Sequence, residues 1–312
     1  MNNSQQNEVP LTKVVTLLVV GLLTFGFAPI LVRFATDVEP LALAAMRTGF
    51  SALMLLPFWF PKRMTLSEIK SAGISNLLLI AAGVSLGLHF TLWIASLHYT
   101  SVASASVLVT IHPVMLIVAE SLLFKTKFRP VVWIGVSIAF TGSVLLGLAD
   151  DTQMDQFPDA IFGNTLAFMS AVVFVAYFML GRKIRQQTEW IDYVFYVYTY
   201  ATITCLVLTL LWVGGVPAIT ATSVLVGIGL AAGPTVLGHG SMNYAVKYIS
   251  PTLLSTLVLS EAVVAATAAF FIFGEIPSGF SLIAMLAIVF GVTLTWVKRM
   301  NRPHRKKTIN NY

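Results

Sequence analysis

Two ionisable residues lie midway along apolar stretches of the sequence, 149 positions apart. His112 lies inside LVTIHPVMLIVAE (Leu108–Glu120), and Glu261 lies inside a matching stretch of the second half. An imidazole can exchange a proton near neutral pH, and a carboxylate can bind a cationic group. The spacing predicts that both side chains face one cavity, where they bind an ionic group of a solute or carry a proton. A structural His–Glu hydrogen bond that joins the two halves is the alternative.

Further polar side chains recur at helical spacing in other apolar stretches. Ser85, His89, Trp93 and Ser96 follow one face, as do Thr235, His239 and Asn243, and Tyr177 could offer its hydroxyl to the same cavity. Lining of the cavity is the expectation, and interhelical hydrogen bonds of roughly 0.6–2 kcal/mol each are the alternative. The predicted substrate-binding residues are His89, Trp93, His112, Tyr177, His239, Asn243 and Glu261.

Three other residues in apolar stretches have less specific interpretations. Arg47 either snorkels outward, bonds carbonyls at the end of the first span, or contacts the substrate. Pro113 removes one backbone hydrogen bond, which either kinks the helix or offers the Val109 carbonyl to the cavity. Glu120 lies near Lys125 and Lys127, so we expect an interfacial ion pair with a neighbouring base.

The composition requires a lipid environment for these residues. Of 312 residues, 57% are hydrophobic and 10% are charged, whereas soluble proteins carry about 25% charged residues. The mean hydropathy is +0.85. The apolar residues form blocks of roughly 20, which is the length that crosses the hydrocarbon core of a bilayer as a helix. The first block is interpreted as a retained span, and the single cysteine, Cys205, excludes an intrachain disulfide.

Ten such blocks predict an all-α polytopic membrane protein with ten transmembrane helices. Helices are expected because lipid offers backbone groups no other partners, and because the blocks lack a period of two. The expected spans are residues 14–34, 41–60, 73–97, 101–123, 130–149, 161–181, 191–213, 221–245, 250–273 and 278–298.

Basic residues alternate from one connecting segment to the next. Seventeen of the 19 Lys and Arg residues fall on one side of the ten spans, and the linker from Asp150 to Asp159 on the other side is acidic. The positive-inside rule therefore places both termini in the cytoplasm, in the cytoplasmic (inner) cell membrane. The basic tail, residues 299–312, is explained by topology and lipid attraction, so no nucleic-acid partner is expected.

The two halves of the chain share a register. A shift of 149 residues places HYTSVASASVLVTIHPV, from His98, on KYISPTLLSTLVLSEAV, from Lys247, and Gly142 on Gly291. Each half contains five spans, an odd number, so the second half enters the membrane from the opposite side. Inverted repeats of residues 14–149 and 161–298 are typical of secondary transporters.

These segments resemble the EamA type of the drug/metabolite transporter superfamily. The resemblance covers both halves and rests on PLALAAMRTG (Pro40–Gly49), HYTSVASASVLVTIHPV (His98–Val114) and FGE (Phe273–Glu275). It implies a carrier, often an exporter, of a small metabolite such as an amino acid or related solute. Its cavity would be lined by spans from both halves, and protons are a candidate coupling ion.

Other functions fit single motifs. Gly83–Gly87 matches G-x-S-x-G, so an intramembrane serine protease using Ser85 with a histidine is one alternative, although close helix packing by small residues explains the motif better. A membrane sensor that binds a ligand without moving it is another. No enzyme, metal site, cofactor or ATP-binding motif is expected, and the oligomeric state, monomer or homodimer, stays open.

Overall fold

The computed structural model describes residues 11–35, 38–65, 67–68, 73–100, 102–150, 158–215, 217–274 and 276–300, which form helices and no strand. The elements are α1 (Leu11–Gly26), α2 (Ala28–Arg33), α3 (Pro40–Trp59), the 3-10 turn η1 (Phe60–Lys62), α5 (Asn76–Tyr99), α6 (Val102–Val109), α7 (His112–Leu123), α8 (Pro130–Asp150), α9 (Ala160–Ile184), α10 (Trp190–Val213), α11 (Ala221–Leu230), the π-helical segment η3 (Ala231–His239), α12 (Gly240–Ala245), α13 (Pro251–Val258), α14 (Glu261–Phe273) and α15 (Gly279–Met300). Asp151 and Asp155 of the acidic linker, Glu275 and residues 301–312 of the basic tail lie outside the described residues.

The predicted spans are helical, and most of them have the length and hydropathy of a membrane span. Eight helical stretches of the described residues meet the length and hydropathy expected of a span. In the predicted fourth and fifth spans, the apolar stretches among the described residues are shorter, Val107–Leu123 and Pro130–Leu146. The all-helical, multi-pass architecture is therefore confirmed, whereas the count of ten full-length spans is not.

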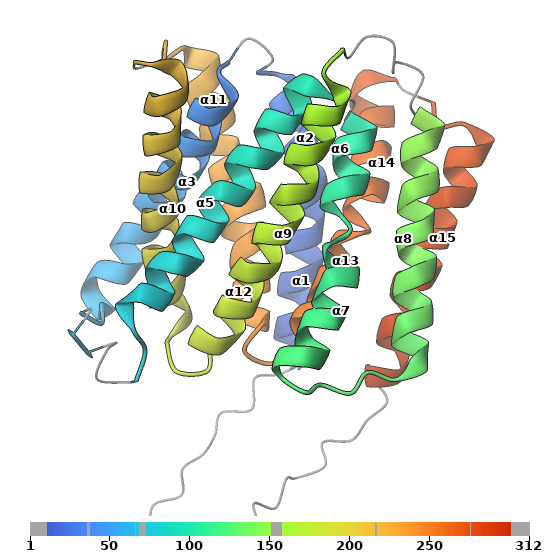
Figure 1. Cartoon of the computed structure of the whole chain (residues 1–312), viewed down its shortest axis with the longest axis horizontal. Coiled ribbons are helices and arrows are strands. Elements are labelled where there is room, and N and C mark those ends of the chain that lie inside the picture. Colours follow the sequence, from blue (N-terminus) through green and yellow to red (C-terminus); the bar gives the residue numbers. More distant parts are fainter. Residues whose placement is uncertain are drawn as a thin grey trace, which may run out of the picture.

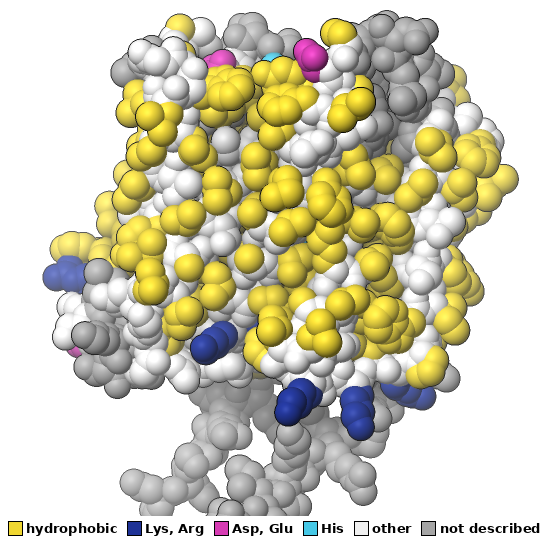
Figure 2. Space-filling view, viewed as in Figure 1, with side chains coloured by type: hydrophobic (Ala, Val, Ile, Leu, Met, Phe, Trp, Pro, Cys, Tyr) yellow, Lys and Arg dark blue, Asp and Glu magenta, His cyan; other side chains and the backbone are white. Residues whose placement is uncertain are grey.

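The helices stand side by side in one bundle with two chemically different ends. The start of α1 and the end of α15 lie at the same end, together with the loop from α7 to α8 (Figure 1). On the face drawn in Figure 2, Lys and Arg gather at this end, most of the visible Asp and Glu lie at the opposite end, and hydrophobic side chains cover the middle. We call these the basic end and the acidic end. The apolar middle includes many exposed side chains, among them Leu53, Ile203, Leu206 and Leu286, as a lipid-facing surface requires.

Helices from the two halves pair in a pattern that follows the 149-residue register. This shift maps α3 onto α10 and α8 onto α15, and each of these two pairs packs along its length. It also maps the packing of α5 on α9 onto the packing of η3 on α1, and both contacts are extensive. A pseudo-two-fold axis between the halves would produce this arrangement.

Glycines set the closest of these contacts. A Cβ at Gly83 in α5 would lie 2.4 Å from the Tyr200 Cβ of α10, and one at Gly87 would lie 2.8 Å from the Thr204 Cβ. Gly142 and Gly291, matched by the repeat, lie in the interface of α8 and α15, where an added Cβ would approach backbone atoms to 2.9 and 2.4 Å. The G-x-S-x-G motif thus serves helix packing.

Candidate functional site

The fourth apolar stretch is interrupted at its middle. Helix α6 ends at Val109, and α7 begins at His112 with Pro113 in its first turn. Thr110 and Ile111 form the turn between them, where the Ile111 amide reaches back to the Leu108 carbonyl at 3.4 Å. Pro113 has no N–H, so the helical bond to Val109 cannot form. The expected break at Pro113 is confirmed, and it exposes a helix start at membrane depth.

The ninth stretch is interrupted at the repeat-related position. Helix α13 ends at Val258 and α14 begins at Glu261, each 149 residues after its counterpart in the first half. The second residue of α14 is Ala262, so this break does not depend on a proline. His112 and Glu261 are therefore the first residues of two matching half-helices. The start of a helix carries the positive end of its dipole, a common feature of binding sites in carriers.

One cavity lies at the level of both breaks. Five of the seven predicted site residues line it, and they come from α5, α7, η3 and α14: His89, Trp93, His112, His239 and Glu261. The cavity has a volume of about 90 Å³, which is room for several water molecules. Three rings, Phe25, Phe90 and Phe174, complete much of the wall. The cavity thus combines aromatic surface with ionisable groups from both halves.

The three histidines of the cavity are packed among these rings. His112 stacks on Phe174 at 4.5 Å between ring centroids, and His239 contacts Phe25 and Phe90 edge to face at 4.8 and 5.0 Å. The Nδ1 atoms of His112 and His239 have no hydrogen-bond partner, although both residues are buried. Buried polar atoms usually have partners, so water or a solute is expected to bond these nitrogens.

Within the described residues His112 and Glu261 make no hydrogen bond to each other, so the structural His–Glu bond considered above is absent there. His89 is bound differently from the other two histidines: its Nδ1 lies 2.9 Å from the Ser170 Oγ of α9.

Tyr177 and Asn243 lie outside the cavity lining. The Tyr177 hydroxyl donates to the Asn243 Oδ1 at 2.7 Å, and both side chains are 0% exposed. This bond joins α9 to α12 within the second half. The sequence pattern identified two polar residues on inward-facing surfaces but could not distinguish a cavity wall from an interhelical hydrogen bond.

Arg47 is a cavity residue that the predicted site omitted. Its side chain is 2% exposed, so it does not snorkel outward, and its Nε donates to the Thr235 Oγ1 of η3 at 2.7 Å rather than to carbonyls of the first span. The guanidinium also lies 3.9 Å from the centre of the Phe90 ring. The sequence could have identified Arg47 as a cavity residue, because an ionisable residue inside a span usually faces protein or a water-filled cavity. Snorkelling was the competing interpretation.

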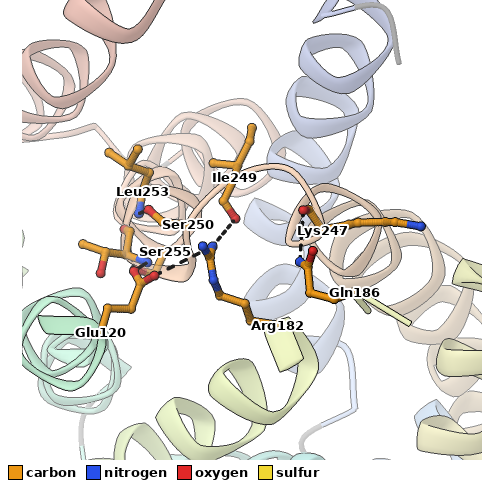
Figure 3. Close-up of polar contacts among 9 residues, drawn as sticks. Glu120, Arg182, Gln186, Lys247, Ile249, Ser250, Leu253 and Ser255 are labelled. Carbon is orange, nitrogen blue, oxygen red and sulfur yellow. Dashed lines mark hydrogen bonds and ion pairs between the residues drawn. The ribbon is translucent and has the colours of Figure 1, made fainter. Parts of the chain in front are cut away.

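A polar cluster joins α7, α9 and α13 between the cavity and the basic end. Glu120 in α7 is 0% exposed, and its carboxylate accepts a bond from the Thr252 amide of α13 at 2.8 Å. The Arg182 Nη1 of α9 lies 3.8 Å from the same carboxylate and donates to the Ile249 carbonyl at 3.2 Å (Figure 3). The expected ion pair of Glu120 is present, but its base is Arg182 of the second half, whereas Lys125 and Lys127 are exposed. We call Glu120, Arg182, Ile249 and Thr252 the latch.

The two ends of the cavity differ in how the interrupted spans pack. Towards the basic end α7 packs against α13. Their counterparts towards the acidic end, α14 and α6, make no contact of similar extent in the described part of the chain. Val109 of α6 and Glu261, Ala262 and Ala265 of α14 instead line the cavity. The interrupted spans therefore pack more closely towards the basic end than towards the acidic end.

The geometry gives no support to the alternative enzyme functions. Ser85 does not line the cavity, and no hydrogen bond joins it to a histidine within the described residues. A serine nucleophile needs such a base within reach. Nor do the described residues bring three His, Cys, Asp or Glu side chains together as a metal site.

The fold and the cavity define a class: multi-pass helical membrane proteins whose two similar halves enclose a polar cavity. The sequence profile of the EamA-like transporter family matches residues 12–148 and 161–297, one match in each half. The chain belongs to the EamA-like transporter family. Its partners are accordingly a small-molecule solute and membrane lipid.

Known structures share the fold. One solved structure, titled "Crystal structure of protein", superimposes with a TM-score of 0.77 over 93% of this chain and 99% of the other, at 16% sequence identity. It is one of 29 chains that match. At this identity the likeness concerns the fold alone. No curated protein matches the sequence.

Proposed function

We propose that the protein is a secondary carrier of the cytoplasmic membrane that exports a small metabolite, such as an amino acid or related solute, by alternating access. The observation that carries the proposal is the position of the cavity, at the level where both repeat-related spans are interrupted. In this proposal residues 14–149 and 161–298 are inverted five-span repeats. The basic end, with both termini and the tail of residues 299–312, faces the cytoplasm.

The difference between the two ends of the cavity supports alternating access. Two matching half-helix pairs exist, and one of them, α7 with α13, is packed while the other, α6 with α14, lines the cavity. Exchange of these two arrangements would close the acidic end and open the basic end. Repeat symmetry makes the two states similar in energy, as a carrier requires. The structure described here then corresponds to the state that is closed to the cytoplasm.

The proposed solute site consists of His89, Trp93, His112, His239 and Glu261, with Tyr177 and Asn243 as its support. Glu261 and the histidines are the candidates for proton coupling. Charged residues at membrane depth are costly unless they serve such a role. The aromatic side chains around them would bind the apolar part of a solute.

Counterflow in proteoliposomes tests this function. Vesicles loaded with one unlabelled metabolite from a broad panel are expected to take up the same labelled metabolite, and Glu261→Gln is expected to reduce the rate about tenfold or more. Asp159→Asn is the matched control, because Asp159 is an exposed acid outside the cavity. Retained ligand binding without flux for the whole panel would contradict transport and favour a sensor.

A further inference from the structure

Arg47 occupies a fixed position on the cavity wall. Helix α3 brings it to the level of the breaks, where its guanidinium packs over the Phe90 ring and its Nε bonds the Thr235 hydroxyl. The ring and the hydroxyl come from α5 and η3, on opposite halves of the chain. Because the side chain is 2% exposed, this geometry is set by packing and not by solvent.

Most N–H donors of the Arg47 guanidinium make no hydrogen bond to the described residues. Arginine has five N–H donors, and the structure gives Arg47 one hydrogen bond, from Nε. It lines the cavity together with Glu261, but among the described residues no carboxylate lies within 4.0 Å of it. A buried cation without a paired anion is costly. The Nη donors therefore suit an anion that enters the cavity.

Thr235 holds Arg47 in this position. Its hydroxyl donates to the Leu230 carbonyl at 2.9 Å, five residues earlier, and this leaves a lone pair that accepts the bond from Arg47. The Thr235 carbonyl in turn accepts a bond from the Tyr198 hydroxyl at 2.9 Å. These bonds fix the residue within η3, a π-helical segment that contains Pro234. Such segments are frequently found at functional sites.

Glu261 provides the opposite pole of the cavity. It lies at the start of α14, and its carboxylate makes no hydrogen bond within the described residues. It is also the only acidic residue in the described lining, and Arg47 the only Lys or Arg. A dianion would be repelled by Glu261, and a dication by Arg47. One positive and one negative group in the same solute satisfy both.

We propose that Arg47 binds the carboxylate of a zwitterionic solute, that Glu261 binds its ammonium group, and that Thr235 is the positioning residue for Arg47. This inference rests on the proposed transport function and names the substrate class of that site. It adds Arg47 as an anion-binding residue and Thr235 as its support. The Phe25, Phe90, Trp93 and Phe174 rings would contact the part of the solute between or beside the two charges.

Matched ligand sets test the proposal on the purified full-length protein. Each set contains a zwitterion, its carboxamide and the acid that lacks the amine: alanine, alaninamide and propanoate, and phenylalanine, phenylalaninamide and 3-phenylpropanoate. Isothermal titration is expected to show at least one zwitterion binding about thirtyfold or more tightly than its amide and its acid. Failure of both zwitterions to bind, or equal affinity for zwitterion and amide, would overturn the proposal.

Substitutions of Arg47 and Thr235 test whether Arg47 binds the carboxylate of the solute. Arg47→Gln is expected to lower zwitterion affinity about thirtyfold or more and to bring the ratio of zwitterion to amide affinity near one. Thr235→Val is expected to reduce that ratio several-fold while amide affinity is kept. Thr48→Val is the control, because Thr48 is buried beside Arg47, bonds the Ala44 and Ala45 carbonyls of its own helix, and does not line the cavity.

Two outcomes separate this inference from the transport function. If Arg47→Gln does not fold, Arg47→Lys provides the second variant. It is expected to keep a weakened preference for the zwitterion, because lysine keeps the positive charge but lacks the paired N–H donors of the guanidinium group. A preference for the zwitterion that survives in Arg47→Gln would contradict the role of Arg47. Counterflow of solutes that have no carboxylate would refute the inference and leave the transport function standing.

Discussion

Glu120→Gln is expected to open the cavity towards the basic end. The substitution keeps the shape of the side chain but removes the charge that binds the Thr252 amide and faces Arg182. A hydrogen bond to a charged group contributes about 1.5–3 kcal/mol. Loss of that amount shifts the equilibrium about 10- to 150-fold away from the closed state. Glu120 is eight residues along α7 from His112, about 12 Å from the cavity level.

Thiol labelling from the basic end measures this shift. A cysteine at Ala262, which lines the cavity, is expected to react about tenfold faster with a membrane-impermeant reagent in the Glu120→Gln background. Glu189→Gln is the control, since Glu189 is exposed and lies between α9 and α10 at the same end. Unchanged labelling in both Glu120→Gln and Arg182→Gln would show that these residues do not close the cavity.

Of the proposed substitutions, Gly291→Val is expected to lower the stability of the protein most. A Cβ at Gly291 in α15 would lie 2.4 Å from the Ala139 nitrogen and 2.6 Å from the Gly135 oxygen of α8. Both are backbone atoms, so the strain can be relieved only if the helices move apart. We expect the free energy of unfolding to fall by about 3 kcal/mol or more, the upper range for overpacking.

Thermal unfolding in detergent, followed by tryptophan fluorescence, measures this effect. Gly279→Ala is the matched control on the same helix, because nothing lies within 4 Å of a Cβ at that position, and it is expected to stay within about 0.5 kcal/mol of the original chain. Gly142→Val, at the repeat-related position of α8, is expected to reproduce the loss. If Gly291→Val and the original chain unfold at the same temperature, the close packing of α8 on α15 is wrong.

The sequence predicted the helical membrane architecture because lipid allows so few alternatives. The bilayer alone dictates both patterns, the apolar blocks longer than 18 residues and the alternation of basic loops. The 149-residue register also predicted that His112 and Glu261 occupy equivalent positions. The structure places both at matching helix starts on one cavity. The π-helical form of η3 was not predicted, although Gly233 and Pro234 lie within it.

Partners across the bundle were harder to predict, because hydropathy indicates which residues avoid lipid but not what they contact. Tyr177 and Asn243 satisfy each other, and so are absent from the cavity wall. Glu120 pairs with Arg182, which lies 62 residues away, and not with the nearby lysines. Arg47 looked able to snorkel, and only the position of Thr235 and Phe90 shows why it stays inside.

Accessibility of one cavity position from both faces of the membrane tests alternating access most directly. A cysteine at Ala262 serves as the probe, and the native Cys205 is fully buried, so the original chain is the unlabelled control. In oriented vesicles the cysteine is expected to react with impermeant reagents added to either face, and a bound solute is expected to protect it on both. Labelling from a single face under all conditions, or no labelling from either, would contradict a carrier with an alternating cavity.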